Sequence, residues 1–188
     1  APSIIDKAKM ICMSTDYINY RLTGKWAIDP STATTFYLAD QRTGKWQKPL
    51  LDALGITEDK LPKLMPTGTP IGHITETAAK ETGLTEKCIV VLGAFDHPTG
   101  ARGAGVIKEG QLLISCGTSW VCFVPLNDRS KIIKERLLCD PFLSSDGGPW
   151  AGMFSLEAVN TKISTYIKKW LGKDYNYVQL DAYARQAE

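Results

Sequence analysis

Residues 88–98 read Cys-Ile-Val-Val-Leu-Gly-Ala-Phe-Asp-His-Pro, and this stretch carries the clearest structural signal in the chain. The run 88–92 is apolar throughout and is followed by turn residues, which predicts a strand buried on both faces. Pro98 can occupy the first turn of a helix, so we expect a helix over 99–107. Asp96 would then lie just past the carboxyl end of a buried strand, where open α/β sheets bind ligands.

The position of Asp96 supports two interpretations. A carboxylate at this point can accept a proton from an attacking hydroxyl, and the start of a helix favours a negative charge. Alternatively, Asp96 only caps the helix, which is the interpretation that position alone favours. His97 can hydrogen-bond a substrate hydroxyl or serve as a structural side chain at the helix start, and both roles stay open.

After Gly110 the pattern changes to β-strands. We expect strands over 111–115 and 120–125, joined in a β-hairpin by a tight turn. Gly117 in that turn permits close approach of the backbone to a ligand. Backbone N–H groups, together with the hydroxyls of Thr118 and Ser119, can hold phosphate oxygens in such a concavity. The alternative is an ordinary hairpin turn, which the short motif alone favours.

Apolar periodicity and turn residues predict further elements along the chain. Residues 61–72 contain three prolines and two glycines, which indicates an irregular surface connection. We place a domain boundary between residues 107 and 108. We expect one or two helices over 4–22 that stop at Gly24, and a short helix over 30–37 that Asp29 can cap. A helix opened by Thr75 runs over 75–81 and stops at Gly83. The remaining predictions are helices over 46–54, 158–171 and 177–187, and a strand over 150–154.

Composition excludes several classes of protein. Among the 188 residues, Lys and Arg are interleaved with acids and the net charge is +2, which argues against a nucleic-acid partner. No apolar run reaches the ~18 residues of a membrane-spanning helix. Five cysteines without a Cys-x-x-Cys pair and two histidines argue against a metal site, and they favour a reducing, cytoplasmic setting.

A series of short motifs runs in order from residue 14 to residue 119. The motifs are Asp16-Tyr17-Ile18-Asn19-Tyr20-Arg21-Leu22-Thr23-Gly24, Asp29-Pro30-Ser31-Thr32-Ala33, Trp46, 51–56, Leu61-Pro62, Gly68, Gly72, Thr82-Gly83-Leu84, Gly93-Ala94-Phe95-Asp96, Gly103-Ala104-Gly105 and Gly117-Thr118-Ser119. No single motif is specific, but the ordered series resembles the FGGY carbohydrate kinases, the group that includes xylulokinase, gluconokinase and glycerol kinase.

The resemblance implies an α/β fold of the actin-like or ribonuclease-H-like kinase type, incomplete and spanning parts of two domains. Residues 1–107 would be the C-terminal part of the sugar-binding domain, and residues 108–188 the start of the ATP-binding domain. It implies phosphorylation of a small sugar or polyol by ATP with Mg²⁺. Asp96 would be the general base and would contact the substrate together with His97. Gly117, Thr118 and Ser119 would contact the nucleotide phosphates.

Several departures from the family pattern limit what the resemblance implies. His97-Pro98 stands where the family commonly has Asn or Gln followed by small residues, which leaves the sugar open. Segment 157–161 lacks the family's glycine, so no nucleotide contact is predicted there. The family's N-terminal Asp-Gly-Thr motif and its C-terminal glycine-rich adenosine motif are absent. We therefore expect a central fragment that is inactive alone, and whose half-exposed cleft favours a homodimer.

Two other classes of function remain as alternatives. One is a non-catalytic sugar- or nucleotide-binding module of the same ancestry, which need not keep a carboxylate at position 96. The other is a plain α/β structural or interaction domain, in which Asp96 and the turn at 117–119 would occur together by coincidence.

Overall fold

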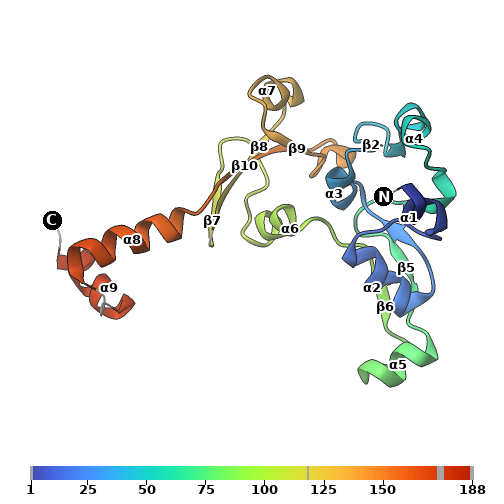
Figure 1. Cartoon of the computed structure of the whole chain (residues 1–188), viewed down its shortest axis with the longest axis horizontal. Coiled ribbons are helices and arrows are strands. Elements are labelled where there is room, and N and C mark those ends of the chain that lie inside the picture. The colour runs from blue at the N-terminus through green and yellow to red at the C-terminus, as the bar shows by residue number, and fades with distance from the viewer. Residues whose placement is uncertain (1, 118, 173–175, 187–188) are drawn as a thin grey trace.

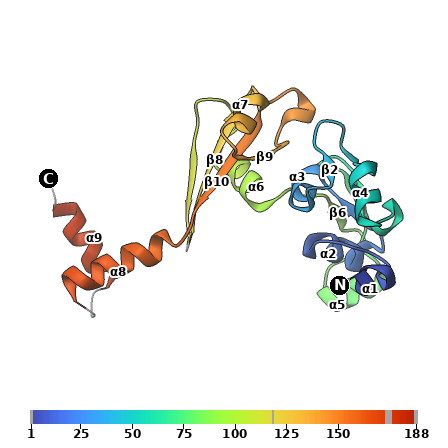
Figure 2. The ribbon, with the colours of Figure 1, turned by 45° about the horizontal axis from the view of Figure 1, so that its top comes forward.

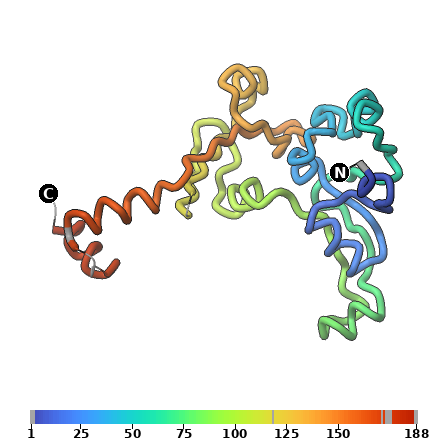
Figure 3. The backbone as a smooth tube through the Cα atoms, viewed as in Figure 1, coloured from blue at the N-terminus to red at the C-terminus, as the bar shows by residue number. Residues whose placement is uncertain are grey.

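The computed structural model describes residues 2–117, 119–172 and 176–186, and its chain forms two lobes and a helical arm (Figure 1). The first lobe holds the elements from α1 to β6. The second holds α6, α7 and the strands β7 to β10, and the arm consists of α8 and α9. The same division is visible in the backbone trace of Figure 3.

Five helices lie among the described residues of the first lobe, and most of their ends follow local signals in the sequence. Asp29 caps its helix by accepting hydrogen bonds from the N–H groups of Ser31 and Thr32, as predicted. The predicted stops at Gly24 and Gly83 are confirmed, because both glycines adopt left-handed φ angles of 72° and 75°. The helices are α1 (Pro2–Lys7), α2 (Ser14–Thr23), α3 (Pro30–Ala33), α4 (Lys48–Leu54) and α5 (Glu76–Thr82).

Short strands pair in three two-stranded sheets within this lobe. The parallel pair is β1 (Ala27–Ile28) with β4 (Lys63–Leu64). The antiparallel pairs are β2 (Ala39–Asp40) with β3 (Lys45–Trp46), and β5 (Pro70–His73) with β6 (Ile89–Val91). The prediction of an irregular connection over 61–72 was therefore wrong, because β4 and most of β5 lie within it.

The prediction that the strand after residue 88 is buried on both faces was also wrong. Ile89 is 54% exposed and Val91 is 49% exposed. The physical reason is that successive side chains of a strand point to opposite faces, and the face of β6 that carries Ile89 and Val91 is exposed. The opposite face does pack, since Val90 lies against the buried cluster that contains Leu92.

The second lobe is built on an antiparallel sheet with the strand order β7-β8-β10-β9. The predicted hairpin is confirmed, and its last register pair joins Cys116 to Trp120. The predicted strand over 150–154 is confirmed as part of β10. Helix α7 and strand β9 had no prediction. The elements are β7 (Leu113–Cys116), β8 (Trp120–Leu126), α7 (Arg129–Lys134), β9 (Leu138–Asp140) and β10 (Trp150–Leu156).

Helix α6 (Asp96–Gly103) starts and ends earlier than the predicted 99–107. It ends early because the chain turns at Gly105, whose φ angle is 74°, and the Val106 N–H bonds back to the Ala101 carbonyl. Pro98 lies in its first turn, as predicted.

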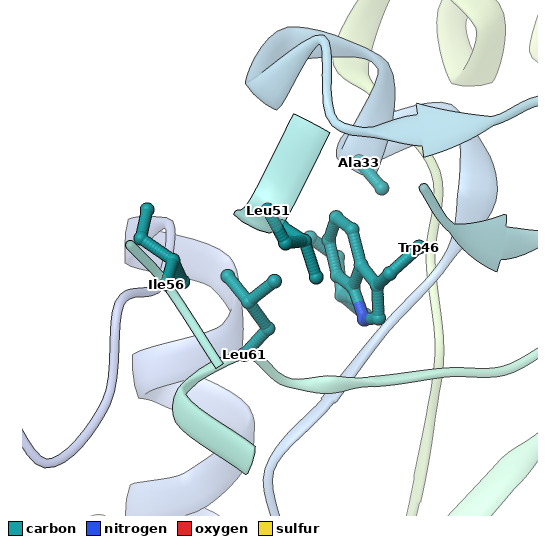
Figure 4. Close-up of a cluster of buried hydrophobic side chains, with 6 residues drawn as sticks. Ala33, Trp46, Leu51, Ile56 and Leu61 are labelled. Carbon is teal, nitrogen blue, oxygen red and sulfur yellow. The ribbon is translucent and has the colours of Figure 1, made fainter. Parts of the chain in front are cut away.

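Each lobe has its own hydrophobic core. The first is centred on Trp46, which packs with Ala33, Leu51 and Leu61 (Figure 4). The Trp46 indole N–H donates to the Pro62 carbonyl at 3.1 Å. In the second, Ala101 of α6 packs with Phe123 and Phe142 against the sheet. Helix α6 therefore packs on the sheet that follows it, and the boundary at residues 107 and 108 stays a prediction.

The arm extends away from the sheet in both views (Figures 1 and 2). It contains α8 (Val159–Leu171) and α9 (Tyr177–Gln186), close to the predicted helices. Its aromatic residues Tyr166 and Trp170 are exposed. No helix among the described residues is both long and apolar enough to cross a membrane. Single 3₁₀ turns complete the fold at Thr34–Phe36, Glu58–Lys60 and Ser144–Asp146.

Candidate functional site

Asp96 is the first residue of helix α6. The N-cap residue is Phe95, so Asp96 is the first helical residue and not the cap. Its Oδ1 accepts the N–H of His97 at 2.8 Å, and its side chain is 78% exposed. Across the described chain, no hydrogen bond reaches Asp96 Oδ2. One carboxylate oxygen is therefore used locally, and the other is open to a ligand.

The His97 ring lies beside that carboxylate. Its Nε2 is 4.0 Å from Asp96 Oδ1, and 27% of the side chain is exposed. The ring also meets Phe95 edge to face, with 5.8 Å between the centroids. This position is compatible with either predicted role, because the ring is partly held by packing and still faces the carboxylate.

Asp96 lies at the rim of a pocket of about 430 Å³, which we call the Asp96 pocket. Several of its walls carry hydroxyl groups, which suit a polyhydroxylated ligand because they can both donate and accept hydrogen bonds. They come from the start of α2, from α3 and from α6. The lining residues are Met13, Ser14, Thr15, Thr32, Ala94, Phe95, Asp96 and Thr99.

A smaller pocket of about 180 Å³ adjoins it and reaches two buried acids, Asp16 and Asp29. Burial raises the pKa of Asp16 to about 6, although its Oδ2 accepts the Met13 N–H at 2.9 Å. Asp29 accepts the Thr67 hydroxyl at 2.8 Å in addition to capping α3. Both acids belong to motifs of the resemblance, but no role in a functional site was predicted for them.

A third buried acid, Asp140, lies at the end of β9 and was not predicted at all. Its side chain accepts the hydroxyl of Ser31 at 2.7 Å and the N–H of Phe142 at 2.8 Å. Burial raises its pKa to about 6, against the opposing effect of these hydrogen bonds. No sequence signal could have found this contact, because Ser31 and Asp140 lie 109 positions apart.

The predicted phosphate-binding turn is exposed at the end of the β7–β8 hairpin. The Gly117 N–H donates to the Ser119 carbonyl at 3.2 Å, so this N–H is used within the turn. A Cβ on Gly117 would meet only that carbonyl, at 3.4 Å, so the rest of its surroundings are open. Thr118, the middle residue of the prediction, lies outside the described residues.

Asn160 at the start of α8 holds this turn. Its amide N–H donates to the Gly117 carbonyl, and its Oδ1 accepts the indole N–H of Trp120 at 2.9 Å. Asn160 therefore joins the residues before and after the turn to one side chain. Sequence reasoning missed it, because it assigned no contact to segment 157–161.

The two predicted sites are not joined among the described residues: none of the hydrogen bonds or ion pairs there links Asp96 or His97 to Gly117 or Ser119. Within the described ranges there is also no group of three or more His, Cys, Asp or Glu side chains that could hold a metal ion.

Comparison with solved structures defines the class of protein. The xylulose kinase of Rhodospirillum rubrum superposes on the whole chain with a TM-score of 0.83 at 28% identity, and the chain covers 38% of it. The glycerol kinase of Plasmodium falciparum with ADP shares the fold at 14% identity, with a TM-score of 0.73 over 89% of this chain and 34% of that one. The fold is thus the actin-like fold of sugar kinases, as predicted.

Sequence comparison identifies the family within that class. The sequence pattern of the "FGGY family of carbohydrate kinases, N-terminal domain" matches residues 1–103. The chain belongs to the FGGY family of carbohydrate kinases. The autoinducer-2 kinase of Yersinia enterocolitica is 39% identical over 161 residues, which are 85% of this chain and 29% of that protein. The corresponding kinase of Klebsiella pneumoniae is 39% identical over 119 residues, and the chain covers 22% of it. The chain thus spans less than a third of these curated relatives.

Proposed function

We propose that this chain is the central segment of a kinase that transfers the γ-phosphoryl group of ATP to a hydroxyl of a sugar or polyol, with Asp96 as general base. The observation that carries the proposal is the Asp96 carboxylate, with one oxygen free at the rim of a hydroxyl-lined pocket. Family membership makes a carbohydrate the expected ligand of that pocket.

In this proposal Asp96 acts on the attacking hydroxyl. The substrate oxygen forms a bond to the γ-phosphorus of ATP while the bond from that phosphorus to the β–γ bridging oxygen breaks. The hydroxyl proton passes to Asp96 Oδ2, the oxygen without an internal hydrogen bond, and ADP leaves. His97 lies close enough to the carboxylate to orient it and to contact a substrate hydroxyl.

The turn at 117–119 contacts the phosphates of ATP in this proposal. The open surroundings of Gly117 and the exposed hydroxyl-bearing Ser119 support that role. The described residues include no cluster able to bind Mg²⁺, so we assign it no protein ligand and no step. Catalysis by this chain's residues would therefore come from positioning and from proton acceptance.

The substrate belongs to the class that the relatives suggest. The matching proteins are named as kinases of autoinducer-2, xylulose, gluconate and glycerol. These four compounds form the natural test panel. We also propose that the isolated chain turns over little or none of them, since it spans less than two fifths of each matched kinase.

Substitution of Asp96 tests the proposal. The intact kinase that contains this segment, its Asp96→Asn variant and the isolated chain are assayed for ADP release with each sugar of the panel, and sugar binding is measured by calorimetry. We expect Asp96→Asn to lower kcat by at least about a hundredfold, because a general base contributes 10²–10⁴-fold, while sugar affinity is retained. Asp59→Asn, an exposed acid of the first lobe, is the control. Near-normal turnover by Asp96→Asn would remove Asp96 from this role.

A further inference from the structure

Helix α6 carries Asp96, and each end of this helix is hydrogen-bonded to a different residue, Ser31 or Phe142. Both of these residues are in turn hydrogen-bonded to the buried side chain of Asp140. At the N-terminal end, the Ser31 hydroxyl donates to Asp140 Oδ2 at 2.7 Å and accepts the backbone N–H of Phe95 at 3.3 Å. Phe95 is the residue directly before Asp96 and is the N-cap of α6. Ser31 thus links the backbone next to Asp96 to strand β9.

The C-terminal end of α6 is attached to the loop that directly follows β9 and Asp140. Arg102 donates to the Phe142 carbonyl at 2.6 Å, and its guanidinium lies 4.8 Å from the centre of the Phe142 ring. The Phe142 N–H in turn donates to Asp140 Oδ1 at 2.8 Å. The two carboxylate oxygens of Asp140 therefore serve the two ends of the helix separately.

The burial of these groups makes the arrangement specific. Asp140 is 0% exposed and Ser31 is 2% exposed, so neither can exchange its partner for water without local opening. Removing one partner leaves a buried polar group unsatisfied, which is more costly than the hydrogen bond itself is worth. The link also crosses between the lobes, because Ser31 lies on α3 and Asp140 on the sheet of the second lobe (Figure 1).

We propose that Asp140 is a positioning residue for the phosphoryl transfer, and that it sets the place of Asp96 through Ser31 and Phe142. This inference rests on the proposed role of Asp96 as base. Asp140 touches neither Asp96 nor the Asp96 pocket, so it acts only through the N-terminal and C-terminal attachments of α6. A displaced base loses rate without losing substrate affinity, because the sugar still contacts the remaining walls of the pocket.

The first test measures the link itself in the isolated chain. Amide hydrogen exchange is followed at Phe95 in the wild type, Ser31→Ala, Asp140→Asn and Ser31→Thr. We expect exchange at Phe95 to be about tenfold faster in Ser31→Ala, with exchange in β8 and α4 unchanged, and to return towards the wild-type rate in Ser31→Thr, which keeps the hydroxyl. The matched control is Ser130→Ala, because Ser130 also donates to an aspartate, Asp128, at 2.7 Å but is exposed. Unchanged exchange at Phe95 in folded Ser31→Ala would overturn the link.

The second test measures its consequence in the intact kinase. We expect Ser31→Ala and Asp140→Asn to lower kcat about ten- to a hundredfold with an unchanged KM for the sugar, and Ser31→Thr to recover most of the loss. Should Ser31→Ala not fold, Asp140→Asn carries the same test, since its amide keeps one acceptor oxygen. Wild-type kcat in folded Asp140→Asn would overturn the positioning role. If the proposed function itself were wrong, the Asp96→Asn variant would remain active. That result differs from wild-type kcat in Asp140→Asn alone, which would refute only the positioning role of Asp140.

Discussion

Replacement of Asp16 by Asn is expected to change how the stability of this chain depends on pH. Asp16 is 1% exposed, and burial raises its pKa from 3.8 to about 6. The folded state therefore binds a proton at Asp16 more tightly than the unfolded state does. This proton raises the free energy of unfolding; its contribution is fully present below about pH 4 and is lost as pH rises through about 6. Since one pKa unit corresponds to about 1.4 kcal/mol, the loss attributable to Asp16 is about 3 kcal/mol.

The Asn variant removes this titration but keeps the amide oxygen that can accept the Met13 N–H. We expect Asp16→Asn to be about 2 kcal/mol more stable than the wild type at pH 7, after allowing about 1 kcal/mol for the weaker cap of α2. The two stability curves should cross near about pH 4.5, and below about pH 3, where Asp16 is protonated in both states, the order should be reversed by about 1 kcal/mol. Urea unfolding followed by circular dichroism between about pH 3 and 8 measures both values, with exposed Asp59→Asn as the control.

The crossing of the two stability curves is the decisive result. The buried acid Asp140, whose pKa is also raised to about 6, keeps a pH dependence of the same sign in both proteins, so only the difference between the curves reports Asp16. Parallel curves for wild type and Asp16→Asn would refute the argument, because they would mean that Asp16 titrates alike in the folded and unfolded chains.

Two further predictions concern the second lobe and the arm. Asn160→Asp keeps the acceptor for the Trp120 indole N–H but loses the donor to the Gly117 carbonyl. We therefore expect amide hydrogen exchange at residues 116–120 to become about tenfold faster, while exchange in the rest of β8 is unchanged. Unchanged exchange at residues 116–120 would show that the turn does not depend on Asn160. The Trp170 side chain on α8 is 75% exposed in the isolated chain. We expect light scattering to show that the chain associates with itself and that Trp170→Ser weakens this association. A wild-type chain that stays monomeric at all concentrations would contradict the predicted homodimer.

Local chemistry determined which parts of the fold could be predicted. The caps at Asp29 and Thr75 and the stop at Gly83 depend on a few neighbouring residues, so the sequence pattern located those helix ends. The hairpin around the turn at 117–119 is local in the same sense. Burial is not local: the apolar run at 88–92 predicts a strand, but whether Ile89 is covered depends on elements far away in the sequence.

The same distinction between local and long-range contacts applies to the residues of the candidate site. Asp96 and Gly117 were found because short motifs and a family resemblance mark them. Asp140 and Asn160 were missed because their partners lie 109 and 43 positions away, and no periodicity records such contacts. Residues that position a site are therefore harder to predict than residues that form it, since only their three-dimensional neighbours give them a role.

The attachments of α6 also explain why Asp96 can be both well placed and reactive. A base whose two carboxylate oxygens both accepted internal hydrogen bonds would be oriented, but neither oxygen would be free to accept the proton of the substrate hydroxyl. Here the backbone of the helix is fixed through Phe95 and Arg102, whereas the carboxylate accepts a single hydrogen bond from His97 among the described residues. Orientation thus comes from the helix, and Asp96 Oδ2 stays free of hydrogen bonds from the described residues. A variant that loosens α6 should therefore slow proton transfer, so that kcat falls while the KM for the sugar stays the same.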